Sequence, residues 1–269
     1  MGAAAVKVTS VVDKTKVDDL RTDTTGNITV DSISDNKTNL DLVNDFADVS
    51  LAAANISVTD VVTLAQANTI HAYNTAVGTT VTLSSVSDAF SNVETLQGTA
   101  GVVMTGATIT TTTAEAVTKA NVTDLNNFTT AKVTVTSVQD SRSNVSDIAA
   151  INNAEVDMGA AAVTITDAVT LAQANTDVGN LNSLTTGKVT LNSVEDTYDN
   201  IQAIKLISDA QVDMNAAAVK VTSVVDKTNV DDLRTDTTGN ITVDSISDNK
   251  TNLGLVNAFT DVCLAAANI

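Results

Sequence analysis

Short stretches in which apolar and polar residues alternate recur along the whole chain. In residues 133–136, Val-Thr-Val-Thr, the two valines face one side of a strand and the two threonines the other. After such a stretch the apolar spacing lengthens to three, as in Val145, Ile148 and Ile151, which is typical of one face of a short helix. The pattern therefore predicts strand–helix units, each opening with a short triplet that contains the apolar strand residues.

These units recur at nearly regular intervals. Successive triplets lie 22, 28, 25, 27, 25, 30, 26 and 30 residues apart, so shorter and longer intervals mostly alternate. The longer units contain a second strand-like piece, such as VVMTGAT at 102–108, before the next triplet. Two neighbouring units form one paired repeat, and we place the paired repeats at about 6–55, 56–107, 108–162, 163–218 and 219–269. The triplets begin at Val6, Ile28, Ile56, Val81, Thr108, Val133, Val163, Val189, Val219 and Ile241.

The first 56 residues return almost unchanged as residues 214–269, a displacement of 213 positions. A fixed internal period is the signature of a repeat array rather than of one globular domain. We therefore interpret residues 1–269 as one continuous stretch of a longer array. The six positions at which the two copies differ are Gly2/Asn215, Lys16/Asn229, Asp41/Gly254, Asp45/Ala258, Ala47/Thr260 and Ser50/Cys263.

A strand and a short helix in so few residues cannot enclose a hydrophobic core alone. Stacked units would share a core, so the sequence predicts an α/β repeat solenoid with parallel strands in register between units. An all-β parallel β-helix is the alternative, because several helical segments are short and valine and threonine favour strands. The residues that should stack in one apolar spine are Val133, Val135, Val163, Ile165, Val189 and Leu191.

Most units carry an aspartate at the corner between strand and helix. Such a carboxylate can accept hydrogen bonds from the first amides of the helix and favours the positive end of its dipole. Stacking would also bring the carboxylates into a column with a spacing of about 5 Å, where calcium could bridge them. Both interpretations stay open, and calcium is the one cofactor that the sequence suggests. The candidates are Asp13, Asp35, Asp60, Asp88, Asp140, Asp167, Asp196, Asp226 and Asp248.

One unit departs from this pattern. Residues 108–132, which begin TITTTTAEAV, have no aspartate at the corner. We therefore expect the function of the corner residue to be dispensable in this unit.

The amino-acid composition excludes some classes of binding partner. The net charge of −18 comes from 32 acidic residues against 14 lysines and arginines. Nucleic acid and anionic membrane surfaces are unsuitable partners, because their phosphates would be repelled. No apolar run approaches the roughly 18 residues of a membrane span, so no membrane insertion is expected. The single cysteine, Cys263, is matched by Ser50 in the other copy, which excludes a disulfide framework.

The sequence contains few residues suited to catalysis. His71 is the only histidine, and no HExxH, paired Cys-x-x-Cys, Gly-rich phosphate loop or Gly-x-Ser-x-Gly motif is present. A unique site also fits poorly on a surface that repeats after 213 residues. We therefore predict no enzyme, with no catalytic and no cofactor-binding residue.

Two segments, VTVTSVQDSRSNVSDIAAIN and VTITDAVTLAQAN, resemble repeat regions of very large secreted bacterial surface proteins, including adhesin-like and surface-layer proteins. This resemblance implies export without disulfides to the surface of a Gram-negative or cyanobacterial cell. We expect a structural module that forms a rod, filament or layer by stacking and self-association, so its partner is a copy of itself. The alternative is the stalk of an adhesin or phage-type fibre, stiffened by calcium, whose binding tip lies elsewhere.

Overall fold

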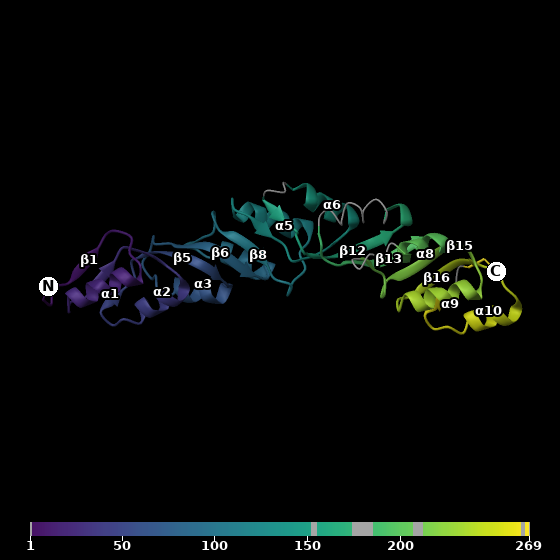
Figure 1. Ribbon diagram of the computed structural model, residues 1–269, viewed down its shortest axis with the longest axis horizontal. Helices are drawn as coiled ribbons and strands as arrows, with labels where there is room; N and C mark the ends of the chain where they lie inside the picture. The colour runs from purple at the N-terminus through teal and green to yellow at the C-terminus, as the bar shows by residue number, and fades with distance from the viewer. Residues whose placement is uncertain (1, 152–154, 174–184, 207–211, 265–266, 269) are drawn as a thin grey trace. The chain divides into compact units, whose positions relative to one another are not determined.

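The computed structural model describes residues 2–151, 155–173, 185–206, 212–264 and 267–268, along which strands and helices alternate (Figure 1). The chain divides into two compact parts, which we describe separately. The N-terminal part contains residues 1–115, 121–134 and 154–157, and the C-terminal part contains residues 116–120, 135–153 and 158–269. We number the strand–helix repeats 1 to 10 in the order of their triplets.

The N-terminal part has helices α1 (Lys14–Asp23), α2 (Lys37–Asn44), α3 (Leu64–His71), α4 (Phe90–Gln97) and most of α5 (Lys119–Phe128). Its strands are β1 (Val6–Val8), β2 (Ile28–Val30), β3 (Ser32–Asp35), β4 (Val49–Ser50), β5 (Asn55–Val62), β6 (Val81–Asp88), β7 (Val102–Val103), β8 (Thr108–Thr111), β9 (Val133–Thr134) and β11 (Val156–Asp157). They form two parallel sheets, β1-β2-β4 and β11-β9-β8-β6-β5-β3, with β7 beside β6.

The C-terminal part has helices α6 (Arg142–Ala150), α8 (Tyr198–Leu206), α9 (Lys227–Asp236) and α10 (Lys250–Val256). Its strands are β10 (Ser137–Asp140), β12 (Ala162–Val169), β13 (Val189–Asp196), β14 (Val212–Asp213), β15 (Ala218–Val225), β16 (Ile241–Ile246) and β17 (Val262–Cys263). One parallel sheet runs in the order β10-β12-β13-β15-β16-β17, with β14 beside β13.

The structure is therefore an α/β protein of alternating strand–helix repeats in parallel sheets, and this part of the prediction is confirmed. The all-β alternative is wrong, because segments with an apolar spacing of three or four form α-helices. In α4, for example, Phe90, Val93 and Leu96 are the buried residues.

Within each paired repeat the two triplets lie side by side in register. In the first pair Val6 is opposite Ile28 and Val8 is opposite Val30. Equal register places the same side of each triplet toward the helices, because side chains alternate between the two faces of a strand. The same alignment recurs for Ile56 with Val81, Val163 with Val189, and Val219 with Ile241. In the third pair it is displaced by one residue, because Ile109, the second residue of its triplet, lies opposite Val133.

Between one pair and the next the register shifts by five residues along the strand. Ile33, five residues after Ile28, lies opposite Ile56 of the next pair. The place beside Ile28 itself is taken by Val49 of the short strand β4. Strands β7 and β14 occupy the equivalent places beside β6 and β13. The longer intervals between triplets therefore contain an extra short strand. The unit that recurs in the structure is thus a pair of strand–helix repeats.

Because of this shift, the expectation that the triplets of successive repeats stack in register in one apolar spine is wrong. Val163 lies opposite Val189, as expected. On its other side, however, Val163 lies opposite Val138, whereas Val133 lies opposite Val156 of β11. Because the short strand already occupies the edge beside the triplet, the next pair can join only the second half of the longer strand.

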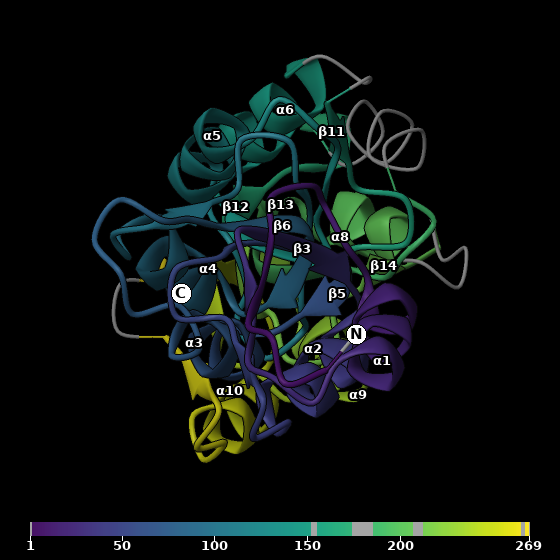
Figure 2. The same cartoon turned by 90° about the vertical axis from the view of Figure 1, so that its left-hand side faces the viewer.

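The apolar core lies between each sheet and the helices on one of its faces. Ile28 and Val30 of β2 are fully buried, as are Leu40 and Val43 of α2. The middle residue of the triplet, Thr29, points to the other face and is half-buried. Figure 2 shows helices α1 to α4 on the outside of strands β3, β5 and β6. Full burial of one such aliphatic side chain contributes about 1.5–3 kcal/mol, so every repeat adds its own section of core.

A buried threonine joins the loops of neighbouring repeats. The Thr237 hydroxyl donates to the Ala217 carbonyl at 2.6 Å and accepts from the Gly239 amide at 2.9 Å. A Cβ at Gly239 would lie 2.2 Å from the same carbonyl oxygen, so glycine allows this close approach. The equivalent threonine contacts are made by Thr24, Thr129 and Thr185.

Candidate functional site

The corner carboxylates lie at the starts of helices, and most of them belong to the repeat that follows the helix. Asp88, at the end of β6 in repeat 4, accepts from the amide of Leu64 at 2.8 Å. Leu64 is the first residue of α3 in repeat 3. The first amides of a helix have no partner within the helix, so this carboxylate satisfies one of them across the boundary between repeats.

The same contact recurs along both parts of the chain. In each case the carboxylate accepts from the first helical amide of the preceding repeat, at 2.7 to 3.0 Å. We call these contacts the cross-repeat caps. They join Asp35 to Lys14, Asp60 to Lys37, Asp140 to Lys119, Asp167 to Arg142, Asp196 to Leu171, and Asp248 to Lys227.

The two remaining candidates have a different role. Asp13 accepts from the amide of Lys16 at 2.9 Å, and Asp226 accepts from that of Asn229 at 2.9 Å. Both are N-caps of helices in their own repeats, α1 and α9. The nine aspartates therefore divide into two N-caps within a repeat, as the capping interpretation expects, and seven cross-repeat caps, which cap the helix of the preceding repeat instead of their own.

Each cross-repeat cap in an even-numbered repeat is held by an asparagine. The Asn92 side-chain amide donates to Asp88 Oδ1 at 2.7 Å, while Oδ2 accepts from the preceding helix. Asn39, Asn144, Asn200 and Asn252 make the same contact with the aspartate four residues before them. Sequence reasoning missed these asparagines, although an Asp-x-x-x-Asn spacing at each of these corners was the available signal.

The expectation that the corner is dispensable in residues 108–132 is wrong. Glu115 of that repeat accepts from the amide of Ser91 at 3.0 Å and from its hydroxyl at 2.9 Å. Ser91 is the second residue of α4, so the longer glutamate side chain replaces the missing aspartate. In repeat 9 the Ser223 hydroxyl accepts from the Tyr198 amide at 2.9 Å. An acceptor is therefore present at nine successive helix starts.

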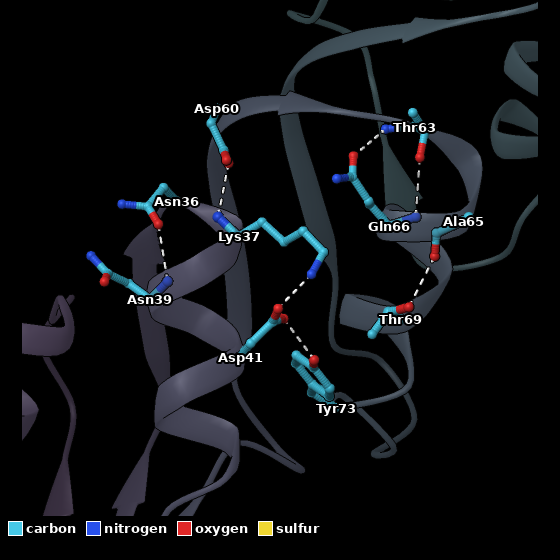
Figure 3. A network of polar contacts seen from close by, with 10 residues as sticks. All are labelled: Asn36, Lys37, Asn39, Asp41, Asp60, Thr63, Ala65, Gln66, Thr69 and Tyr73. Carbon is cyan, nitrogen blue, oxygen red and sulfur yellow. Dashed lines mark hydrogen bonds and ion pairs between the residues drawn. The ribbon is translucent and has the colours of Figure 1, made fainter.

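Figure 3 shows how one cross-repeat cap is accompanied by a side-chain network. Asp60 accepts from the Lys37 amide at 2.9 Å. The Lys37 ammonium forms an ion pair with Asp41, which also accepts from the Tyr73 hydroxyl at 2.7 Å. Burial and the hydrogen bond to Asp41 raise the pKa of Tyr73 to about 12. Helix α2 is therefore tied to the next repeat at its start and along its length.

At three corner carboxyls, hydrogen bonds outweigh the effect of burial on the pKa. Burial by itself raises the pKa of Asp88, but hydrogen bonds from Asn92 and from the Leu64 and Ala89 amides outweigh it. The resulting pKa lies below the ordinary aspartate value, and the same balance lowers the pKa values of Asp140 and Asp196. The charged carboxylate is thus the form in which Asp88, Asp140 and Asp196 cap the helices.

Arginine side chains, which could take part in binding, also form contacts within the fold. The Arg21 guanidinium lies 3.8 Å from the centre of the Phe46 ring, and its Nε donates to Asp48 at 2.9 Å. Arg234 repeats this arrangement with Phe259 and Asp261. These arginines hold helices to adjoining loops. Cys263 is exposed, with a free thiol.

The C-terminal part contains a cavity of about 650 Å³. Among the described residues that line it, the charged ones form two ion pairs, Lys188 with Asp213 and Lys205 with Asp236. The charges of these four residues therefore neutralise each other in pairs.

Comparisons with protein-family models, curated proteins and solved structures give no match. None of the helices that the structure describes is long and apolar enough to cross a membrane. Within the described ranges, no three or more His, Cys, Asp or Glu side chains come together in a group that could hold a metal ion. The contacts between repeats are therefore the feature of the chain that bears on its function.

We predict that Glu115→Ala destabilises the protein by about 1 kcal/mol, the usual effect of losing a helix cap. Glu94→Ala, on the exposed surface of α4, is the matched control and should stay within about 0.5 kcal/mol of the parent. Urea unfolding measures both. Equal effects of the two substitutions would mean that the Glu115 contact with Ser91 does not stabilise the helix.

Acid should weaken the cross-repeat caps. Since Asp88, Asp140 and Asp196 have lowered pKa values in the folded protein, they stabilise it fully above the unfolded aspartate pKa of about 3.9. That stabilisation is lost as the pH falls through the lower folded pKa values. The triple Asp→Asn variant should therefore be less stable at pH 7 and lose less stability on acidification, as measured by urea unfolding at a series of pH values.

Amide substitution of three exposed carboxylates, Glu94, Asp124 and Asp199, provides the control for that experiment. It should leave the pH dependence close to that of the parent. A triple cap variant whose stability falls with acid as steeply as the parent would contradict the assignment.

Proposed function

We propose that the chain is a structural repeat module of an extracellular surface protein, in which the strand–helix repeats continue as an α/β solenoid. Its function is mechanical: it supplies length and stiffness and forms a rod, filament or layer by stacking and self-association. The observation that carries this proposal is the acceptor that joins each of nine successive helix starts to the following repeat. Such a chain can be lengthened by adding repeats, since a solenoid repeat contacts its neighbours and little else.

The use of polar side chains supports a scaffold rather than an enzyme or a recognition module. The corner aspartates and their asparagines are hydrogen-bonded within the chain, as are Arg21 and Arg234. Aromatic residues make up 2% of the sequence, whereas strong specific interfaces depend on Trp, Tyr and Arg. The proposal therefore assigns no catalytic or cofactor-binding residue.

The resemblance to repeat regions of bacterial surface proteins supports the extracellular location. An adhesin stalk or phage-type fibre would use the same module, and a binding domain elsewhere in the full-length polypeptide would favour that alternative. Calcium stays a prediction for the corner aspartates, since the amide contacts leave carboxylate oxygens with further lone pairs. This prediction requires that calcium promotes association of the chains more than sodium does at equal ionic strength.

A break in the core should remain local in a solenoid. Val135, which is 1% exposed, provides the test. Val135→Asp should remove hydrogen-exchange protection from β8 to β12 while β1 to β4 keep theirs, because the damage reaches only neighbouring repeats. Ser146→Asp introduces the same charge on the exposed side of α6 and should leave protection unchanged. Loss of protection along the whole chain in the Val135 variant would contradict the solenoid.

A further inference from the structure

The larger sheet of the N-terminal part has one face that is turned away from the helices. Helices α2 and α3 pack on the other face of β5 and β6 (Figure 1). In β6, Thr82 and Ser84 are exposed. They alternate with Val81 and Leu83, which are at most 1% exposed. Since side chains alternate between the two faces of a strand, the two hydroxyl groups lie on the face without helices.

The neighbouring strands continue this surface. Val61 of β5, which is 56% exposed, lies opposite Ser85 of β6. Ser85 in turn lies opposite Thr108 of β8, and its hydroxyl accepts from the Thr108 hydroxyl at 2.8 Å. We call this surface the neutral face, and it is formed by Val61 of β5, Thr82, Ser84 and Ser87 of β6, and Thr108 and Thr110 of β8.

All of these side chains are uncharged, although the chain as a whole has a net charge of −18. The acidic residues of β5 and β6 are Asp60 and Asp88, which accept hydrogen bonds from the starts of α2 and α3. The equivalent strands of the C-terminal part differ in this respect. There Glu195 of β13 occupies the position of Ser87, and it forms an ion pair at 2.8 Å with Lys220, which lies opposite it in β15.

Neighbouring repeats are present on both sides of the neutral face. Strand β5 pairs with β3 on the edge away from β6, and β8 pairs with β9. The backbone groups of these strands are therefore already used within the sheet. A partner of the neutral face has to pack against it and cannot add a strand to it.

We propose that the neutral face packs against the same face of a second copy of this chain. Two copies of so acidic a chain repel each other where carboxylates meet, whereas two neutral faces meet without that repulsion. A hydroxyl group both donates and accepts hydrogen bonds, so identical faces can satisfy each other across a two-fold axis. This inference rests on the proposed function and names the surface through which the chains associate side by side.

One pair of neutral faces should form a weak interface. A stable interface has about 20–30 residues on each side, and the neutral face has fewer. Association of the chain should therefore be measured by sedimentation equilibrium at high protein concentration.

The C-terminal part suggests a substitution that leaves the net charge unchanged. Ser87→Glu/Thr110→Lys gives the neutral face the ion pair that Glu195 and Lys220 form at the equivalent positions, so the fold should accommodate it. Covering these charges with a second chain removes them from water, so the dissociation constant of the dimer should rise about tenfold or more. The reciprocal exchange, Glu195→Ser/Lys220→Thr, is the control and should not weaken association.

A second variant tests the same face if the ion-pair variant does not fold. Thr82 is exposed, so Thr82→Asp leaves the apolar core unchanged. Because both chains then bring a negative charge into the interface, association should be lost. Gln97→Asp adds the same charge on the exposed surface of α4 and should associate like the parent.

A folded neutral-face variant of either kind that associates as strongly as the parent would overturn the proposal, and so would a loss of association in the reciprocal exchange. Either result leaves self-association, and with it the proposed function, in place. A parent chain that stays monomeric at every concentration reached would overturn the proposal and contradict the proposed function as well, which separates the two failures.

Discussion

The hydrogen bond between a corner acceptor and the first amide of the preceding helix is the interaction on which the arrangement of repeats depends. A helix of eight to ten residues, such as α3 or α1, is marginal alone and leaves its first amides without partners. Supplying the acceptor from the following repeat couples the two, because the first helical amide has no partner within its own helix. Glu115 and Ser223 preserve this coupling where aspartate is absent.

The register shift between pairs adds a second constraint. The triplets of a pair align directly, whereas the next pair joins the second half of the preceding strand, as Ile33 does with Ile56. Small residues are needed where the loops approach closely, and this explains Gly187, whose Cβ would lie 2.1 Å from the Ala161 carbonyl. Positions away from these contacts vary between the two copies: Asp41, which accepts from Tyr73, is matched by Gly254.

The strand–helix alternation and the capping aspartates could be predicted because they follow from local patterns. The switch from a period of two to a spacing of three or four marks the strand and helix of each repeat. The register shift could not be predicted, since it depends on which edge the short strand β11 occupies beside Val133. The partner of each corner residue was equally inaccessible: a sequence shows that Asp88 can cap a helix, but not that the helix begins at Leu64, 24 residues earlier. For the same reason the role of Glu115 was missed.

The most direct test of the account is the pH titration of the Leu64 amide, followed by its nuclear magnetic resonance shifts. Since Asp88 accepts from this amide, the signal should move as Asp88 is protonated, with a midpoint below the ordinary aspartate value of about 3.9. Asp88→Asn should abolish the titration while leaving the signals of residues in distant repeats in place. A Leu64 signal that does not respond to the ionisation of Asp88 would show that the following repeat does not hold this helix.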